Sequence, residues 1–317
     1  MNRTLGVIAI LAALMVSVVV LVVAPPKKLV HRNDAVSETV FEMVAAEELP
    51  NCWKVSDGLY SGGQPEGEAG FAKLTEMGVR TVISVDGAKP EVELAEQHGL
   101  RYVHLPHGYD GVSDEHAQKL CKALIELEGP VYIHCHHGHH RSPAAAAMAS
   151  IGLGNMPKEK GEEFLKLAGT SDRYQGLYQS VAGASEYDED SLCSLEVEFS
   201  PTVPTPPEVQ SMVAAEKHFD ALKRFSKNKW QQLESHPDLD ASHEALLLAE
   251  QFAELMRVDS GRGQEYAELL KTSQQNAFQL HTFLYGKTMS AEPISLADKM
   301  VTEIGNECRS CHANFRD

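Results

Sequence analysis

A cysteine, five histidines and an arginine lie within VYIHCHHGHHRS, residues 131–142 of this 317-residue sequence. A thiol is nucleophilic only as thiolate, and Cys135 precedes a helix-favouring run, SPAAAAMASIG, whose first N–H groups would stabilise negative charge. Arg141 can bind two oxygens of a phosphate with its planar fork. Gly138 can let the backbone turn tightly around the anion. These residue types indicate a nucleophile in an anion-binding loop.

The elements around this loop alternate in type. Apolar runs typical of strands occupy residues 81–87, 101–107 and 131–135, and helical stretches occupy 91–99 and 114–129. Such alternation predicts an α/β domain with a parallel-containing central sheet flanked by helices. Ligands of such sheets bind beyond the carboxyl ends of the strands, which is where the cysteine is expected.

The loop resembles the HCxxGxxRS/T signature of the cysteine-dependent protein tyrosine and dual-specificity phosphatases. The matching residues are His134, Cys135, Gly138, Arg141 and Ser142. Residues 55–87 also resemble the opening of the compact bacterial dual-specificity-like phosphatases, with a Gly-Gln-Pro turn before a helix and a strand. Rhodanese-like and arsenate-reductase-like proteins, which also hold a cysteine in an anion loop, are the alternatives.

The resemblance implies a role for each residue of the loop. Cys135 would be the nucleophile, Arg141 would bind the phosphate, and Ser142 would hydrogen-bond the sulfur as it leaves a phosphocysteine intermediate. The substrate-binding set is His134, His136, His137, Gly138, His139, His140 and Arg141. The four histidines after the cysteine could stabilise the thiolate or select an acidic substrate. An alternative is that they bind Zn²⁺ or Cu²⁺.

A phosphatase of this kind also needs an aspartate on a separate loop to protonate the leaving oxygen. Asp110, in HGYDGVSDE after the strand at 101–107, is the predicted acid. Asp114 is the second choice, because it resembles the start of the next helix.

The C-terminal part of the sequence has helical periodicity throughout. Residues 208–233, 243–258, 263–286 and 294–317 place apolar side chains three and four apart, which predicts an all-α four-helix bundle. The last stretch contains CRSCH: the thiols of Cys308 and Cys311 suit thioether bonds to a haem. The adjacent imidazole can bind the iron. A redox disulfide or half of a zinc site can have the same spacing.

Four helices that end in CRSCHANFR resemble the class II c-type cytochromes, the cytochrome c prime group. The resemblance implies one covalent haem c bound through Cys308 and Cys311, with His312 as the iron ligand. Met212 is the candidate sixth ligand, with His218 behind it; an apolar residue there would leave the iron open. A redox partner protein and a homodimer through the bundle are further expectations.

The charge composition and the N-terminal segment indicate which ligands and which cellular location to expect. With 45 acidic and 28 basic residues the formal charge is -17, which argues against nucleic-acid binding. The apolar run at 5–24 is long enough for a transmembrane helix, and a cleaved signal peptide is the alternative. Lys27 and Lys28 after the run favour a cytoplasmic body. Covalent haem attachment, however, takes place outside the bacterial inner membrane, so we expect a single-pass inner-membrane protein with its body in the periplasm.

The expected organisation is a membrane segment, a tether, a phosphatase-like domain, an acidic and Pro/Thr-rich linker, and a haem bundle. Their bounds are 1–24, 25–50, 51–185, 186–206 and 207–317. The predicted substrate is a phosphorylated protein or a small phosphate monoester. A rival hypothesis is a haem electron-transfer or sensor protein whose first domain only binds an anion or acts as a thiol redox module. A third is that the haem redox state governs Cys135.

Overall fold

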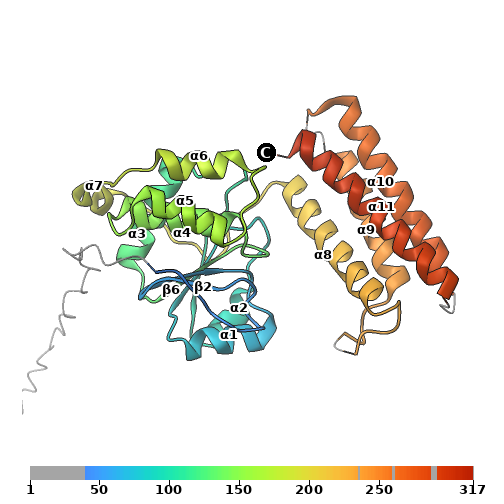
Figure 1. Cartoon of the computed structure of the whole chain (residues 1–317), viewed down its shortest axis with the longest axis horizontal. Helices are drawn as coiled ribbons and strands as arrows, with labels where there is room; N and C mark the ends of the chain where they lie inside the picture. Colours follow the sequence, from blue (N-terminus) through green and yellow to red (C-terminus); the bar gives the residue numbers. More distant parts are fainter. Residues whose placement is uncertain (1–39, 235, 259–260, 287–290, 317) are drawn as a thin grey trace, which may run out of the picture. The chain divides into compact units, whose positions relative to one another are not determined.

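The computed structural model describes residues 40–234, 236–258, 261–286 and 291–316 (Figure 1). The membrane helix expected at 5–24 and the first part of the expected tether lie outside these residues. No helix in the described ranges combines the length and the apolar character needed to cross a bilayer. Two groups of elements, one built on a sheet and one of helices alone, have separate hydrophobic cores.

A six-stranded sheet has the order β1-β2-β3-β6-β4-β5. Its strands are β1 (Glu42–Met43), β2 (Trp53–Ser56), β3 (Leu59–Gly62), β4 (Thr81–Ser84), β5 (Arg101–His104) and β6 (Val131–His134). The predicted strands at 81–87, 101–107 and 131–135 are confirmed as β4, β5 and β6, and they pair in parallel. β3 is parallel to β6, whereas β1 and β2 add an antiparallel edge.

Helices cover both faces of the sheet (Figure 1). One face carries α1 (Gly67–Glu76) and α2 (Val92–Gln97), and the other carries α3 (Asp114–Glu126), α4 (Arg141–Gly152), α5 (Lys158–Leu167) and α6 (Gln175–Gly183). Alternate side chains of each strand divide between the faces: Ile83 and Ile133 belong to the core under α3–α6, while Val82 and Tyr132 belong to the core under α1 and α2. This alternation follows from the two-residue period of a strand.

α4 is the central helix of its layer, packed against α3, α5 and α6. Each of its residues from Arg141 to Gly152 is buried, and five of them are alanines. Small side chains let the helix lie close to the sheet and to three neighbouring helices. The helix therefore begins at a fixed place beyond the carboxyl end of β6, one loop after Cys135.

The segment after α6 packs on the sheet domain, although its sequence predicts a linker. α7 (Glu189–Ser194) is held by the buried Lys122, whose Nζ donates to the carbonyls of Leu192 at 3.1 Å and Cys193 at 3.0 Å. Phe199 packs against the core, and the backbone N–H of His104 donates to the Ser200 carbonyl at 2.9 Å. The acidic and proline-rich composition of this segment does not predict these contacts, because the contacts are made by backbone groups and by isolated apolar residues.

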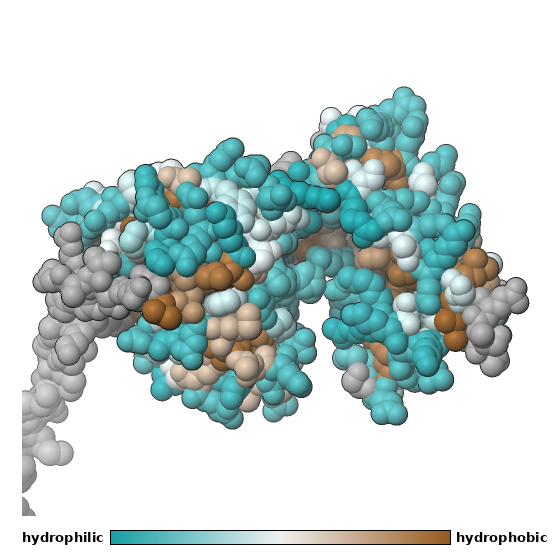
Figure 2. All heavy atoms as spheres, in the orientation of Figure 1, coloured by the Kyte–Doolittle hydropathy of each residue, from teal (hydrophilic) through white to brown (hydrophobic). Residues whose placement is uncertain are grey.

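The four predicted helices of the C-terminal part are confirmed as α8 (Pro207–Lys227), α9 (Ala241–Arg257), α10 (Gly263–Leu284) and α11 (Ala291–Phe315). Residues three and four apart, such as Leu248, Phe252 and Leu255, form the shared core. Asp240 caps α9 by accepting the His243 N–H at 2.8 Å. Mostly hydrophilic side chains cover the face of these helices seen in Figure 2, as expected for amphipathic helices.

Candidate functional site

Cys135 and Ser142 meet beyond the end of β6, as their spacing predicts. Cys135 is 4% exposed, and its Sγ lies 3.3 Å from Ser142 Oγ in the first turn of α4. The hydroxyl of Ser142 donates to the Gly62 carbonyl at 2.9 Å. Rotation of this hydroxyl would direct its proton to the sulfur, so the serine can stabilise a thiolate at this position.

The backbone between them turns at Gly138, which has φ 76°. A Cβ at this position would overlap the backbone of Gly62 and Gly63, so the loop accepts only glycine there. The carbonyl of Gly138 accepts a hydrogen bond from Asn51 Nδ2 at 2.8 Å, and the same amide donates to the Ala168 carbonyl at 2.9 Å. Asn51 therefore braces the loop, a role that the sequence did not reveal.

Arg141 is held by a carboxylate that the sequence analysis missed. Its Nη2 donates to Asp86 Oδ2 at 2.7 Å, and the backbone N–H of His136 donates to the same oxygen at 2.7 Å. Ala88 N donates to Asp86 Oδ1 at 2.9 Å. Asp86 ends the run TVISVD. An acidic residue at the carboxyl end of a buried strand often lies at a ligand site, and this position could have identified Asp86 from the sequence.

The charges of this pair stabilise each other. Burial alone would raise the pKa of Asp86, but Arg141 and the N–H donors of Ala88 and His136 outweigh it, so the pKa is lowered. Burial likewise disfavours the guanidinium charge, but Asp86 more than offsets this and raises the pKa of Arg141. Both groups are therefore ionised at neutral pH.

The Nε donor of Arg141 is left for a ligand. Its Nε is buried and makes no hydrogen bond within the described part of the chain. The Tyr109 ring lies 4.5 Å from the guanidinium carbon and covers one face of it. The Asp86 contact fixes the side chain through Nη2, so the Nε–H remains for an oxygen of a bound anion.

Three of the five loop histidines bond to other groups of the sheet domain. His134 is buried with its Nε2 2.6 Å from the Tyr102 hydroxyl, and burial lowers its pKa to about 4. His139 Nδ1 lies 2.8 Å from the Ala168 carbonyl, and His140 Nδ1 accepts the Ser171 N–H at 3.3 Å. These rings support the loop. Substrate contacts of the histidines stay a prediction, as does metal binding.

The rings of His136 and His137 lie next to each other, with centroids 4.3 Å apart. His137 is exposed and His136 is half-buried. Unlike the other three loop histidines, these two do not hydrogen-bond through their rings to the α5–α6 connection or to the sheet.

The loop between β5 and α3 carries the candidate acid. Asp110 is exposed, and its backbone lies so close to α6 that a Cβ on Gly176 would overlap the Asp110 carbonyl. The neighbouring Tyr109 packs on Arg141, so this loop borders the anion-binding loop. Asp114 begins α3 and accepts a hydrogen bond from the Tyr187 hydroxyl at 2.8 Å. Both aspartates are exposed, and the Asp114 carboxylate also accepts a hydrogen bond from Gln118 Nε2 at 2.8 Å.

The residues of CRSCH lie near the end of α11. Cys308 and Cys311 are free thiols one helical turn apart; Cys311 belongs to the bundle core and Cys308 packs against it. Burial, with a smaller effect of Cys311, raises the pKa of Cys308 to about 11. Burial lowers the pKa of His312 to about 4, which leaves a neutral imidazole, the form that binds metal ions.

Met212 lies at the level of this motif. Phe219 of α8 packs against Gly305 of α11, where an added Cβ would come within 3.1 Å of the ring. The two helices are antiparallel (Figure 1). Two turns before Phe219 on α8 and two turns after Gly305 on α11 therefore reach Met212 and His312 at the same end of the bundle. Two thiols, an imidazole and a thioether at one end of a bundle fit a covalently bound haem.

His218, the alternative iron ligand, is directed elsewhere. Its Nδ1 lies 2.8 Å from Glu244 Oε2 on α9, and both side chains are largely buried. This contact orients the ring toward a carboxylate of α9, and the choice of Met212 as sixth ligand stays a prediction.

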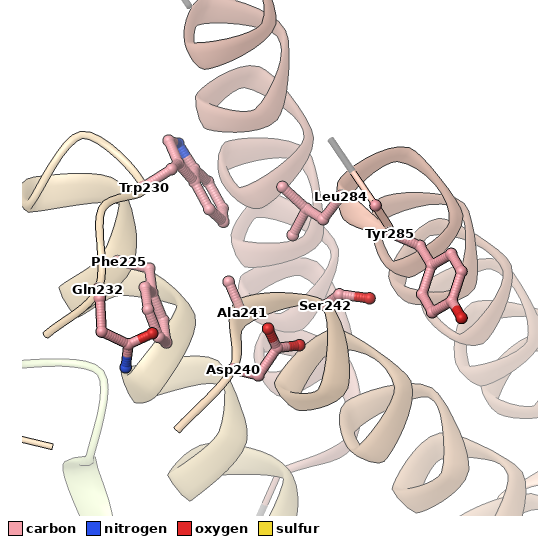
Figure 3. Close-up of a pocket in the computed structure, with 9 residues that line it drawn as sticks. Phe225, Trp230, Gln232, Asp240, Ala241, Ser242, Leu284 and Tyr285 are labelled. Carbon is pink, nitrogen blue, oxygen red and sulfur yellow. The ribbon is translucent and has the colours of Figure 1, made fainter. Parts of the chain in front are cut away.

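A pocket of about 340 Å³ lies at the opposite end of the bundle (Figure 3). Phe225, Trp230 and Leu284 form its apolar side, and Gln232, Asp240 and Ser242 contribute polar groups. None of the predicted site residues lines it, so this pocket is separate from both candidate sites.

Comparison with known proteins finds that part of this chain is similar to phosphatases. No protein-family model matches the chain. Over 130 residues the chain is 32% identical to the dual specificity protein phosphatase TpbA of Pseudomonas aeruginosa strain UCBPP-PA14, covering 40% of this chain and 59% of that protein. The corresponding protein of strain ATCC 15692 is 31% identical over the same length. The match thus spans less than two thirds of these relatives.

Two solved structures are also similar to part of this chain. The crystal structure of P. aeruginosa TpbA is 28% identical with a TM-score of 0.41, covering 49% of this chain and 95% of that one. A putative phosphatase (DUF442) from Shewanella putrefaciens CN-32 is 22% identical with a TM-score of 0.38, covering 44% and 95%. In sequence, 40% of this chain is thus similar to the dual specificity protein phosphatase TpbA.

Proposed function

We propose that the sheet domain hydrolyses phosphate monoesters through a phosphocysteine intermediate. The observation that carries the proposal is the loop itself: a buried Cys135 lies 3.3 Å from Ser142, around a Gly138 with φ 76° and beside an anchored Arg141. Homology to a protein named as a dual specificity phosphatase supports it. The proposed substrate is a phosphorylated protein or a small phosphate monoester.

The reaction would proceed in two displacements. The Cys135 thiolate attacks phosphorus, the bond to the leaving oxygen breaks, and Asp110 donates a proton to that oxygen. Asp110 then removes a proton from water, which attacks phosphorus and breaks the P–S bond. The Ser142 hydroxyl rotates from the Gly62 carbonyl toward sulfur and stabilises the departing thiolate, while Arg141 binds the phosphoryl oxygens.

Hydrolysis of an aryl phosphate by the chain without residues 1–30 tests this proposal. We expect Cys135→Ser to abolish turnover. Asp110→Asn should slow substrates with poor leaving groups more than those with good ones, because only the former need the proton. Asp114→Asn is the matched control, and its side chain is bound by Tyr187. Equal losses for both aspartates, or activity in Cys135→Ser, would contradict the assignment.

We also propose that α8–α11 bind one haem c. Thioether bonds from Cys308 and Cys311 and ligation by His312 are the proposed contacts, with Met212 as sixth ligand. The bound group would supply electron transfer or gas binding at this end of the bundle. The support is that the motif lies at the end of the last helix of an antiparallel bundle, with Met212 at its level.

Haem attachment can be tested by expression with a periplasmic export signal and cytochrome maturation factors. The absorption spectrum of the denatured protein in alkaline pyridine should show two thioether bonds, and Cys308→Ala or Cys311→Ala should change it. Absence of covalent haem under these conditions would leave the bundle as a haem-free module.

The same proposal extends to location and partners. Haem c attachment is consistent with an inner-membrane anchor at residues 5–24 and a periplasmic body. It is also consistent with a redox partner protein and with pairing of two copies through the bundle. Reporter enzymes fused to the C-terminus test the topology: activity of a periplasm-specific reporter is expected, whereas activity of a cytoplasm-specific reporter alone would reject it.

A further inference from the structure

His104 connects the active-site loop to the segment that follows α7. It ends β5, is 1% exposed, and its Nδ1 lies 3.1 Å from the backbone N–H of Val203. A backbone N–H can only donate, so Nδ1 is the acceptor and the ring proton lies on Nε2. That nitrogen donates to the backbone carbonyl of Asp86 at 2.8 Å. Burial lowers the pKa of His104, which keeps the ring in this neutral form.

The far side of Asp86 faces the proposed phosphate site. The carbonyl of Asp86 accepts from His104, and the carboxylate accepts from Arg141 and from His136 N, each at 2.7 Å. Four groups are thus joined in sequence by hydrogen bonds: the Val203 N–H, the His104 ring, Asp86, and the guanidinium of Arg141. The backbone pairing of His104 with Ser200 at 2.9 Å holds the segment in register.

We propose that the backbone N–H of Val203 and the ring of His104 position Asp86 and, through it, the phosphate-binding Arg141. This inference rests on the phosphatase function proposed above and extends it. A segment outside the sequence signature, leading toward α8, would then determine how well the loop binds a phosphoryl group. If these contacts only stabilised the fold, their loss would leave the phosphate affinity of the folded protein unchanged.

Val203→Pro removes the single N–H that His104 accepts and keeps an extended backbone. The loss of one buried hydrogen bond corresponds to a fall of about threefold to tenfold in kcat/KM for an aryl phosphate, and we expect inorganic phosphate to inhibit more weakly by a similar factor. Val203→Ala retains the N–H and should behave as the wild type. Thr202→Pro controls for the introduction of a proline in the same segment.

A double-mutant comparison shows whether the effect passes through Asp86. In an Asp86→Asn background, which weakens the contact to Arg141, Val203→Pro should have little further effect. A full, additive loss in that background would overturn the proposal, as would unchanged phosphate inhibition in folded Val203→Pro. Thermal unfolding of each variant establishes that the protein is folded.

His104 provides a second test if Val203→Pro fails to fold. His104→Gln keeps an amide N–H that can donate to the Asp86 carbonyl, whereas His104→Ala does not. We expect the glutamine variant to retain more of the phosphate affinity, and equal affinities for the two variants would reject the positioning role.

Failure of the proposed function gives a different result. If the wild type hydrolyses no phosphate ester, binding of inorganic phosphate measured by calorimetry still compares Val203→Pro with Val203→Ala. Phosphate binding that weakens only in the proline variant would support the positioning role without catalysis, and equal binding would remove it.

Discussion

Removal of the Asp86 carboxylate should destabilise the sheet domain strongly. In Asp86→Ala, Arg141, whose side chain is 10% exposed, would stay buried without its counter-charge. The N–H groups of His136 and Ala88 would also lose their acceptor. Loss of one partner of a buried ion pair costs about 3–5 kcal/mol. This is a large part of the roughly 5–15 kcal/mol by which a domain is stable.

The two tryptophans of the chain allow this to be measured in one unit at a time. Trp53 belongs to the sheet-domain core and Trp230 to the bundle core, and both are buried. In a Trp230→Phe background, urea unfolding followed by fluorescence reports the sheet domain alone. The matched control is Asp57→Ala, which removes a fully exposed carboxylate paired with Lys54 and should leave the midpoint unchanged.

The pH dependence has a definite sign. Because the pKa of Asp86 is below its ordinary value of 3.8 in the folded state, its contribution is present above that pH and is lost as the pH falls through the folded value. The wild type should therefore lose stability more steeply than Asp86→Ala on acidification below about pH 4. Equal midpoints for Asp86→Ala and Asp57→Ala at neutral pH would refute the reasoning.

Three further results are expected. Gly138→Ala should abolish phosphate inhibition and turnover, since the added Cβ overlaps the backbone of Gly63; a variant that binds phosphate normally would show that the loop can relax. Ser142→Ala should slow the second step about tenfold, the value of one hydrogen bond to a charged group, and so produce a burst of aryl alcohol in rapid-mixing experiments; an unchanged steady state would exclude this role. If haem c is bound, Met212→Ala should open the sixth position, and a ferrous spectrum that responds to carbon monoxide only in this variant would support Met212 ligation.

The parts of the fold with strong periodicity could be predicted from the sequence. β4, β5 and β6 are apolar runs, and the helices of the bundle repeat apolar residues every three to four positions. β2 and β3 were missed because they are four residues each, and each contains a serine, with a glycine at the end of β3. The Asp57-Gly58 pair between them is a hairpin signal that would have revealed them.

Some residues of the candidate site could be predicted from the sequence and others could not. Cys135, Gly138, Arg141 and Ser142 are close in sequence, so their spacing alone indicates that they share a loop. Asp86 lies 55 positions from Arg141, and the contact of Asn51 with Gly138 joins residues 87 positions apart. Contacts at such separations depend on how the strands are ordered in the sheet, which periodicity does not specify.

The burial of α4 on all sides limits which substitutions the chain can accept. Ala147 is completely buried, and a Cβ on Gly161 of α5 would lie 2.8 Å from Ile151 and from Val181. A larger side chain at such positions costs typically about 1–3 kcal/mol and shifts the backbone. Because Arg141 is the first residue of this helix, a shift would move the guanidinium as well. Variation far behind the active site would thus change phosphate binding before it unfolds the protein, and a screen of α4 for altered activity should find variants among its alanines.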